Sequence, residues 1–209
     1  MILKSPPIAH VLMIRPGATE FDDQQRMKGS LDMPISVKGQ KQIAAMAEEL
    51  SDINIKTIFV APERSARETA EQIAASNGAK IRGTKIRGSR AGETKIKVIE
   101  AFRNVDHGLW HGKLIDEVRR NHPRVYRTGI DTPEELCPPE GEPIREARER
   151  SAKALKKCLK KSRDGVVAFV ISDPMAAVIE SMINGNELHD IWSSEIDNGS
   201  WNLVEFDRD

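Results

Sequence analysis

Short apolar segments that alternate with charged helical segments constrain the fold of this chain more than any other feature. His10–Ile14 and Val166–Ile171 are runs of a few apolar residues with almost no polar interruption, and Thr57–Ala61 is a third, weaker run. Such runs are typical of strands buried on both faces of a sheet. Trp201–Phe206 alternates apolar and polar residues and predicts a last strand that closes the sheet.

Helical patterns separate these strands. Ser36 is a candidate N-cap, and Ile43, Met46, Ala47 and Leu50 supply the apolar stripe of the helix that follows it. Further helices are expected at 64–75, 114–121, 144–161 and 175–183. The stretch 80–97 is expected to be a loop or a weak edge strand, and the Pro- and Glu-rich stretch 132–143 a surface excursion.

This alternation predicts an α/β fold: a three-layer α/β/α sandwich with a mostly parallel central sheet. No internal repeat or low-complexity linker divides the sequence. We therefore expect one domain over residues 1–209.

Charge and cysteine content exclude several classes of protein. Lys+Arg and Asp+Glu both number 32, so the net charge offers nothing to attract nucleic acid or an anionic membrane. The longest apolar run, Ile8–Ile14, is far too short to span a bilayer. Cys137 and Cys158 form no CxxC pair and no disulfide framework. A cytoplasmic protein is expected.

Ligands bind beyond the carboxyl ends of the strands in sheets of this kind, so the residues after each strand matter most. The motifs found there and in the connecting segments, in chain order, are Arg15-Pro16-Gly17-Ala18-Thr19, Arg26-Met-Lys-Gly29, Asp32-Met-Pro34-Ile-Ser36, Ala61-Pro62-Glu63-Arg64-Ser65-Ala66, Phe102-Arg103-Asn104 with Gly108-Leu-Trp110-His-Gly112, Pro139-Glu-Gly141-Glu142, Ile171-Ser172-Asp173 and Asn198-Gly199-Ser200.

In order and spacing, these motifs resemble those of the histidine phosphatase (phosphoglycerate mutase-like) superfamily. The resemblance covers nearly the whole chain and implies the same sandwich fold. It implies transfer of a phosphoryl group to a histidine nitrogen and then to water or another hydroxyl, without a cofactor. It also implies that arginines and a second histidine hold the phosphoryl oxygens while a carboxylic acid protonates the leaving oxygen. Family members are often monomers or dimers.

Mapped onto this family, the chain departs from the pattern at four of its five central positions. Pro16 stands at the nucleophile, Ser65 at the second arginine, Asn104 at the acid and Asp173 at the second histidine, and Arg15 alone is kept. Proline has no side-chain lone pair, and an amide cannot deliver a proton. Losing a nucleophile alone costs about a millionfold in another covalent hydrolase. We therefore expect a non-catalytic member that binds an unknown protein or small molecule through the vestigial pocket.

The alternative is an active phosphatase or mutase with a rebuilt site. Arg64 and Arg67 flank Ser65 and offer replacement charge, and His107 offers a replacement nucleophile. Asp22 occupies a position where the family usually has a phosphate-contacting asparagine, and with Asp23 and Asp173 it could contribute to a metal site. The spacing does not demand a metal, and none is expected.

One geometric prediction follows from the two residues that leave neighbouring strand ends. An arginine partly removed from water needs an acceptor, and a carboxylate provides one in bidentate geometry. We expect Arg15 and Asp173 to form a direct salt bridge or to share one water. The pair would then fill the phosphate position with the protein's own charge.

Overall fold

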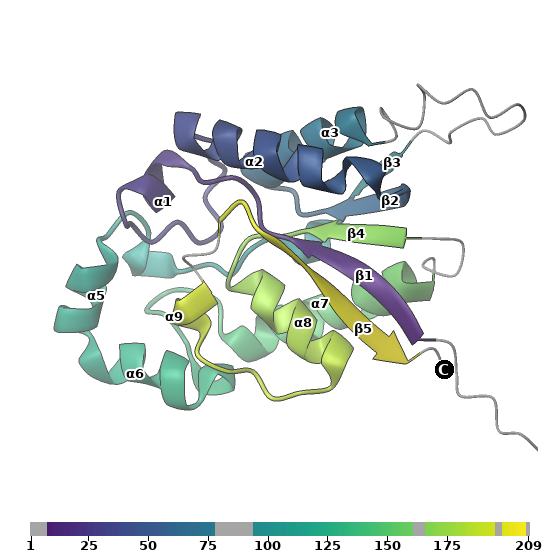
Figure 1. The fold of residues 1–209 in the computed structure, drawn as a ribbon. Helices are drawn as coiled ribbons and strands as arrows, with labels where there is room; N and C mark the ends of the chain where they lie inside the picture. The colour runs from purple at the N-terminus through teal and green to yellow at the C-terminus, as the bar shows by residue number, and fades with distance from the viewer. Residues whose placement is uncertain (1–7, 78–93, 161–165, 195–197, 208–209) are drawn as a thin grey trace, which may run out of the picture.

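The computed structural model describes residues 8–77, 94–160, 166–194 and 198–207, and within them five strands form one sheet (Figure 1). The strands are β1 Ile8–Ile14, β2 Ile55–Val60, β3 Lys95–Val98, β4 Val166–Val170 and β5 Trp201–Asp207. Their order is β3-β2-β4-β1-β5. Only β5 runs antiparallel, against β1. The predicted mostly parallel sheet is confirmed.

β1 and β4 pair inside the sheet and are buried on both faces over the apolar runs that they contain, as those runs predict. Residues 11–14 of β1 and 167–170 of β4 are all 0–1% exposed. They pair in parallel, with Met13 opposite Phe169 and Ile14 opposite Val170. Because parallel neighbours end at the same edge, the residues that follow Ile14 and Val170 are brought together there.

Helices cover both faces of the sheet, which confirms the three layers (Figure 1). α2 Val37–Glu49 and α3 Arg64–Ser76 pack on one face, and α7 Ile144–Leu159 and α8 Met175–Asn184 on the other. Ser36 caps α2 as predicted, since its hydroxyl accepts a hydrogen bond from the Gly39 N–H at 3.1 Å.

Shorter elements complete the described fold. They are α1 Glu20–Asp23, α5 Ile115–Asn121, α6 Pro123–Asp131, α9 Ile191–Ser194 and 3-10 turns at 50–52, 100–102, 108–110 and 133–135. Helix α6, which begins at a proline in its first turn, was not predicted. No helix within these described ranges has both the length and the apolar character needed to cross a membrane.

The expectation of a surface excursion at 132–143 is only partly right. A 3-10 turn forms there, and Pro133 and Leu136 are buried. The segment is also fixed to the preceding turn, because the Leu109 N–H donates to the Pro139 carbonyl at 3.0 Å. In 80–97, Lys95–Val98 forms the edge strand β3, and the residues up to 93 lie outside the described part.

Candidate functional site at the carboxyl ends of the strands

The floor of the site is built where β1 and β4 end side by side. Arg15 follows β1, and its N–H donates to the Ser200 carbonyl at 2.9 Å. The Pro16 carbonyl accepts from the Gly199 N–H at 2.8 Å, and Gly199 has a positive φ of 69° that favours glycine. These backbone bonds hold the end of β1 against the turn that leads into β5.

The predicted salt bridge between Arg15 and Asp173 is confirmed, with Nε 3.1 Å from Oδ2. Its geometry differs from the expectation, because Glu180 of α8 takes the bidentate role. The two terminal nitrogens of Arg15 donate to the Glu180 carboxylate at 3.0 and 2.9 Å. One of them also donates to the Asn202 amide oxygen of β5. Four hydrogen bonds therefore engage a guanidinium whose side chain is only 10% exposed.

Two carboxylates around one arginine leave an excess of negative charge at this floor. Burial alone would lower the pKa of Arg15, but Asp173 and Glu180 outweigh it and the pKa is raised. Burial raises the pKa of Asp173 to about 6, although the Arg15 charge and the Ala177 N–H act in the opposite direction. Arg15 thus stays charged while Asp173 titrates near neutral pH.

Asn104 is fully buried and every group of its amide is used. Its Nδ2 donates to the carbonyls of Gly29 and Asp173 at 3.0 and 2.7 Å. Its Oδ1 accepts from the Met175 N–H, at the start of α8, at 3.1 Å. Its own N–H donates to Glu63 at 2.6 Å. Asn104, which the resemblance aligns with the family's acid, is a structural link between three segments.

Asp22 lies in the first turn of α1 and is neutralised by a buried lysine. Its carboxylate accepts from the Thr19 N–H and hydroxyl, both at 2.7 Å, in a capping box. Lys28 Nζ lies 3.0 Å from Asp22 Oδ2, and the lysine side chain is 8% exposed. The Asp22 carboxylate is therefore already used by the Lys28 ion pair and by the cap of α1. Within the described residues, no three metal-ligating side chains gather anywhere.

Pro16 and Ser65 form the wall between β1 and α3. Pro16 is buried, and the Gly17 N–H after it donates to the Thr69 hydroxyl at 3.2 Å. Ser65, 2% exposed, lies in the first turn of α3, where its carbonyl accepts from the same hydroxyl at 2.7 Å. This wall presents no cationic side chain.

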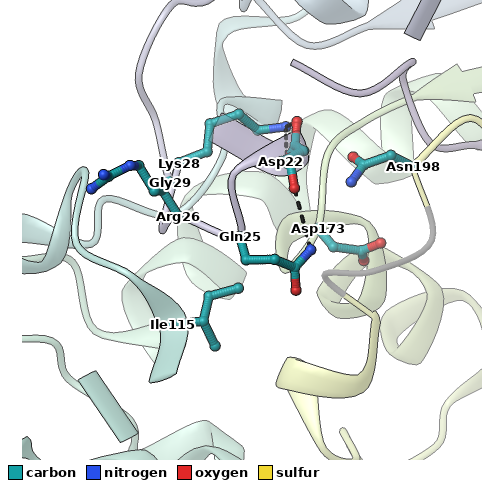
Figure 2. A pocket seen from close by; sticks show the side chains of 8 residues that line it. All are labelled: Asp22, Gln25, Arg26, Lys28, Gly29, Ile115, Asp173 and Asn198. Carbon is teal, nitrogen blue, oxygen red and sulfur yellow. Dashed lines mark hydrogen bonds and ion pairs between the residues drawn. The ribbon is translucent and has the colours of Figure 1, made fainter. Parts of the chain in front are cut away.

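A narrow hollow of about 20 Å³ remains among these groups. That volume admits roughly one water molecule. Its lining consists of Asp22, Gln25, Arg26, Lys28, Gly29, Ile115, Asp173 and Asn198. Figure 2 shows Lys28 and Gln25 meeting Asp22, with Asp173 and Asn198 beside them. Asp173 lines the hollow and Arg15 does not, so of this ion pair only the carboxylate faces a ligand. Arg26 and Lys28 supply the cationic part of the lining, and Lys28 is paired with Asp22.

The candidates for a rebuilt site are placed elsewhere. Arg64 is exposed and its Nε lies 2.6 Å from Glu68, one helical turn on, while Arg67 approaches Asp32 at 3.9 Å. His107 is fully buried, with ring contacts to His111 and Trp192 and no part in lining the hollow. Burial lowers its pKa to about 4.

Four residues that shape the floor were not predicted. Glu180 and Asn202 engage Arg15, and Lys28 neutralises Asp22. Buried Glu63 bonds Asn104, and its second oxygen has no hydrogen-bond partner within the described residues. Burial raises the Glu63 pKa against the effects of Asn104, Lys28 and Arg150. A signal existed for Glu180 alone, since it lies seven residues, or two helical turns, after Asp173.

Comparison with known proteins identifies relatives along almost the whole chain. The sequence profile of the Histidine phosphatase superfamily (branch 1) matches residues 11–209. "Phosphoserine phosphatase 1" of Hydrogenobacter thermophilus is 26% identical over 199 residues, which cover 95% of this chain and 87% of that protein. A "Probable phosphoglycerate mutase" of Escherichia coli O1:K1 / APEC is 29% identical over 148 residues, 71% of this chain and 62% of that protein.

Solved structures with the same fold include two mycobacterial proteins. "Mycobacterial hydrolase 1" superposes with a TM-score of 0.79 at 19% identity, covering 95% of this chain and 92% of that one. A mycobacterial glucosyl-3-phosphoglycerate phosphatase in complex with VO3 gives a TM-score of 0.76 at 20% identity, covering 93% and 92%. At these identities the likeness concerns the fold.

Proposed function

The chain belongs to the histidine phosphatase superfamily, and we propose that it is a non-catalytic member that acts by binding a partner at the face around the former phosphoryl site. A reducing, cytoplasmic location belongs to the same proposal, because Cys137 and Cys158 are both free thiols. So does a single domain over residues 1–209, because the five strands share one sheet.

The state of Arg15 carries the proposal. It is the only kept member of the group that would hold a phosphoryl oxygen, and its guanidinium is already bonded to Asp173, Glu180 and Asn202. A phosphate dianion would have to displace two carboxylates that lie within hydrogen-bond distance. The hollow beside them has room for about one water molecule. A small anion therefore finds Arg15 and Lys28 already paired with carboxylates and little space beside them, which favours a protein surface as the partner.

The other central positions support the same conclusion. Pro16 offers no nucleophile, and both amide hydrogens of Asn104 are bonded to carbonyls. His107 would need to leave a buried aromatic environment to reach a substrate at the hollow.

The competing function is an active phosphatase, and the activities after which the relatives are named favour it. The relative from Hydrogenobacter thermophilus is called a phosphoserine phosphatase and matches 95% of this chain. An active form of this protein would need a nucleophile other than Pro16. His107 and the carboxylates of the floor are the candidates that the chain offers.

Turnover measurements separate the two functions. The purified chain is assayed with an aryl phosphate and with phosphoserine, from acidic to alkaline pH, with and without divalent cations. The relative from Hydrogenobacter thermophilus serves as the positive control. We expect no turnover above that of the Arg15→Met variant. Turnover that is lost in His107→Gln or Asp173→Asn would overturn the non-catalytic assignment and identify the rebuilt site.

A further inference from the structure

A second concave region lies on the α7 side of the sheet, between that helix and the edge strand β3. It is an open groove of about 430 Å³, within the usual size range of small-molecule sites. Its lining consists of Phe59, Lys97, Ile99, Ala101, Arg150, Lys153, Ala154, Lys157 and Cys158. None of these residues lines the hollow at the strand ends. We call this region the α7–β3 groove.

The floor of the α7–β3 groove is apolar. Phe59 of β2 lies beneath it, buried and in contact with Phe169 at a ring-centroid distance of 5.5 Å. Ile99 continues the face of β3 that carries Lys97, because side chains two residues apart in a strand share a face. Ala154 of α7 closes the other side with a small side chain. The floor can therefore receive a planar or branched apolar group.

The rim of the α7–β3 groove is cationic. Lys153 and Lys157 stand one turn apart on α7, and Lys97 lies across from them. None of the nine described lining residues is acidic. Within the described part of the chain, Lys153 and Lys157 make no ion pair. Arg150 differs, because Glu142 holds its guanidinium at 2.6 and 2.9 Å.

Structural roles explain part of this charge. Lysines on an edge strand discourage pairing with another sheet, which accounts for Lys97. A cation in the last turn of a helix stabilises its carbonyl end, which accounts for Lys157. Neither role explains Lys153, which lies four residues before Lys157 and repels it. An anion between the two lysines would relieve that repulsion.

We propose that the α7–β3 groove binds a small amphipathic organic anion. Its apolar body lies on Phe59, Ile99 and Ala154, and its carboxylate, sulfonate or phosphate head meets Lys153 and Lys157. The site is independent of the vestigial hollow. It therefore stands or falls separately from the non-catalytic assignment.

The probe for this site is naphthalene-1-sulfonate, which is permanently charged and cannot be hydrolysed. Binding is measured by calorimetry and mapped by amide NMR on the full chain, with 1-naphthol and inorganic sulfate as the neutral and the purely ionic comparisons. We expect the sulfonate to bind more tightly than both comparisons and to shift resonances of α7, β2 and β3. Equal binding of 1-naphthol or of sulfate would overturn the amphipathic requirement.

Matched variants test the assigned residues. Lys153→Gln with Lys157→Gln should weaken binding by about tenfold or more, since each lysine contributes a charge-assisted bond. Lys156→Gln removes an equal charge from the same helix outside the groove and should change affinity by less than about twofold. Ala154→Leu should also weaken binding by filling the floor. An unchanged affinity in the double variant, with its melting curve intact, would show that the groove is not the site.

Discussion

The hollow at the strand ends and the α7–β3 groove both have cationic side chains nearby. The two regions differ in whether those cations have carboxylate partners. Beside the hollow, Arg15 is buried and bonded by Asp173 and Glu180, and Lys28 in its lining is paired with Asp22. In the groove, Lys153 and Lys157 are left without acidic partners among the described residues. At the strand ends, where the family's chemistry takes place, Arg15 and Lys28 are already paired with carboxylates, and we call this the closed region. In the α7–β3 groove the two lysines are unpaired over the described ranges, and we call this the open region. A cation thus marks a binding site only when its charge is available to a ligand.

The largest expected effect comes from removing the cation of the closed region. Arg15→Met leaves the buried carboxylate of Asp173 and the half-buried carboxylate of Glu180 without their partner, and breaking a buried pair in this way costs about 3–5 kcal/mol. Chemical denaturation measures the loss in free energy of unfolding. The control is Arg64→Met. It breaks only the exposed ion pair between Arg64 and Glu68, one helical turn apart, and should cost less than about 0.5 kcal/mol. Equal losses would mean that the Arg15 cluster contributes no more than a surface pair.

The next effect is a pair of opposite pH dependences. The folded-state pKa of Asp173 is raised to about 6, so its stabilising contribution is complete below about 3.8 and is lost as the pH rises through 6. The folded-state pKa of His107 is lowered to about 4, so its contribution is complete above about 6.5 and is lost as the pH falls through 4. In the wild-type chain, the two groups change the free energy of unfolding in opposite directions as the pH moves between about 4 and 6.

Single variants separate these slopes. Relative to wild type, Asp173→Asn should lose about 3 kcal/mol of unfolding free energy as the pH falls from about 6 to about 3.8. His107→Gln should gain about 3 kcal/mol relative to wild type as the pH falls from about 6.5 to about 4. The measurement is the free energy of unfolding at several pH values, in which unrelated groups cancel between variant and wild type. Slopes that match wild type in both variants would contradict the buried, shifted states of these two groups.

A binding effect follows from opening the closed region. Removal of Asp173 alone leaves Arg15 bonded to Glu180, so the arginine stays paired. The double variant Asp173→Asn, Glu180→Gln should release the Arg15 charge and raise affinity for inorganic phosphate by about tenfold or more. Calorimetry measures it, with Asp173→Asn as the intermediate. No gain in the double variant would mean that space, and not charge, excludes phosphate.

A smaller effect is expected in the open region. Lys153→Glu replaces a like-charge pair with an acid that lies four residues before Lys157, the favourable orientation. Thermal unfolding should show a gain of about 0.5 kcal/mol. The same substitution should weaken naphthalene-1-sulfonate binding. Lys156→Glu provides the comparison at an adjacent position outside the groove, and a loss of stability specific to Lys153→Glu would show that this lysine has an unrecognised structural partner.

No effect on turnover is expected from Pro16→His. The imidazole would still lack an acid at Asn104 and an arginine at Ser65, and catalytic groups act as a unit. Aryl phosphate hydrolysis measures this directly. Turnover within about tenfold of an ordinary enzyme, near 10 per second, would show that the site has been mapped wrongly.

The sequence was sufficient to predict the mostly parallel sheet and one side-chain contact of the site. Apolar runs identify strands when burial is two-sided, and β1 and β4 satisfy this condition. The Arg15–Asp173 contact could be predicted because both residues follow adjacent strand ends. The contact of Glu180 with Arg15 could be predicted only in part: the seven-residue spacing from Asp173 fits two helical turns, but the rotation of α8 about its axis decides whether the side chain reaches Arg15. Asn202 depends on the register of β5 with β1, which places it opposite Met13.

Helix α6 and the buried part of 132–143 were missed for a different reason. Each segment contains few apolar residues, and α6 is only nine residues long, which is too short for its apolar face to identify it as a helix from the sequence. Gly129, for example, is buried because Trp192 packs against it, so that an added Cβ would lie 2.4 Å from the indole nitrogen. Such contacts form between segments distant in sequence, and no local pattern encodes them.

The fully bonded amide of Asn104 has a consequence for protein engineering. A designer who wished to install an acid there would replace its two N–H donors with oxygen. That oxygen would face the carbonyls of Gly29 and Asp173, which are themselves acceptors. The Met175 N–H would keep a partner, and the single O–H of a protonated acid could donate to one carbonyl, but the other carbonyl would lose its partner. New chemistry and the anchoring of α8 would compete for the same side-chain atoms, so redesign would have to begin with the backbone around Gly29.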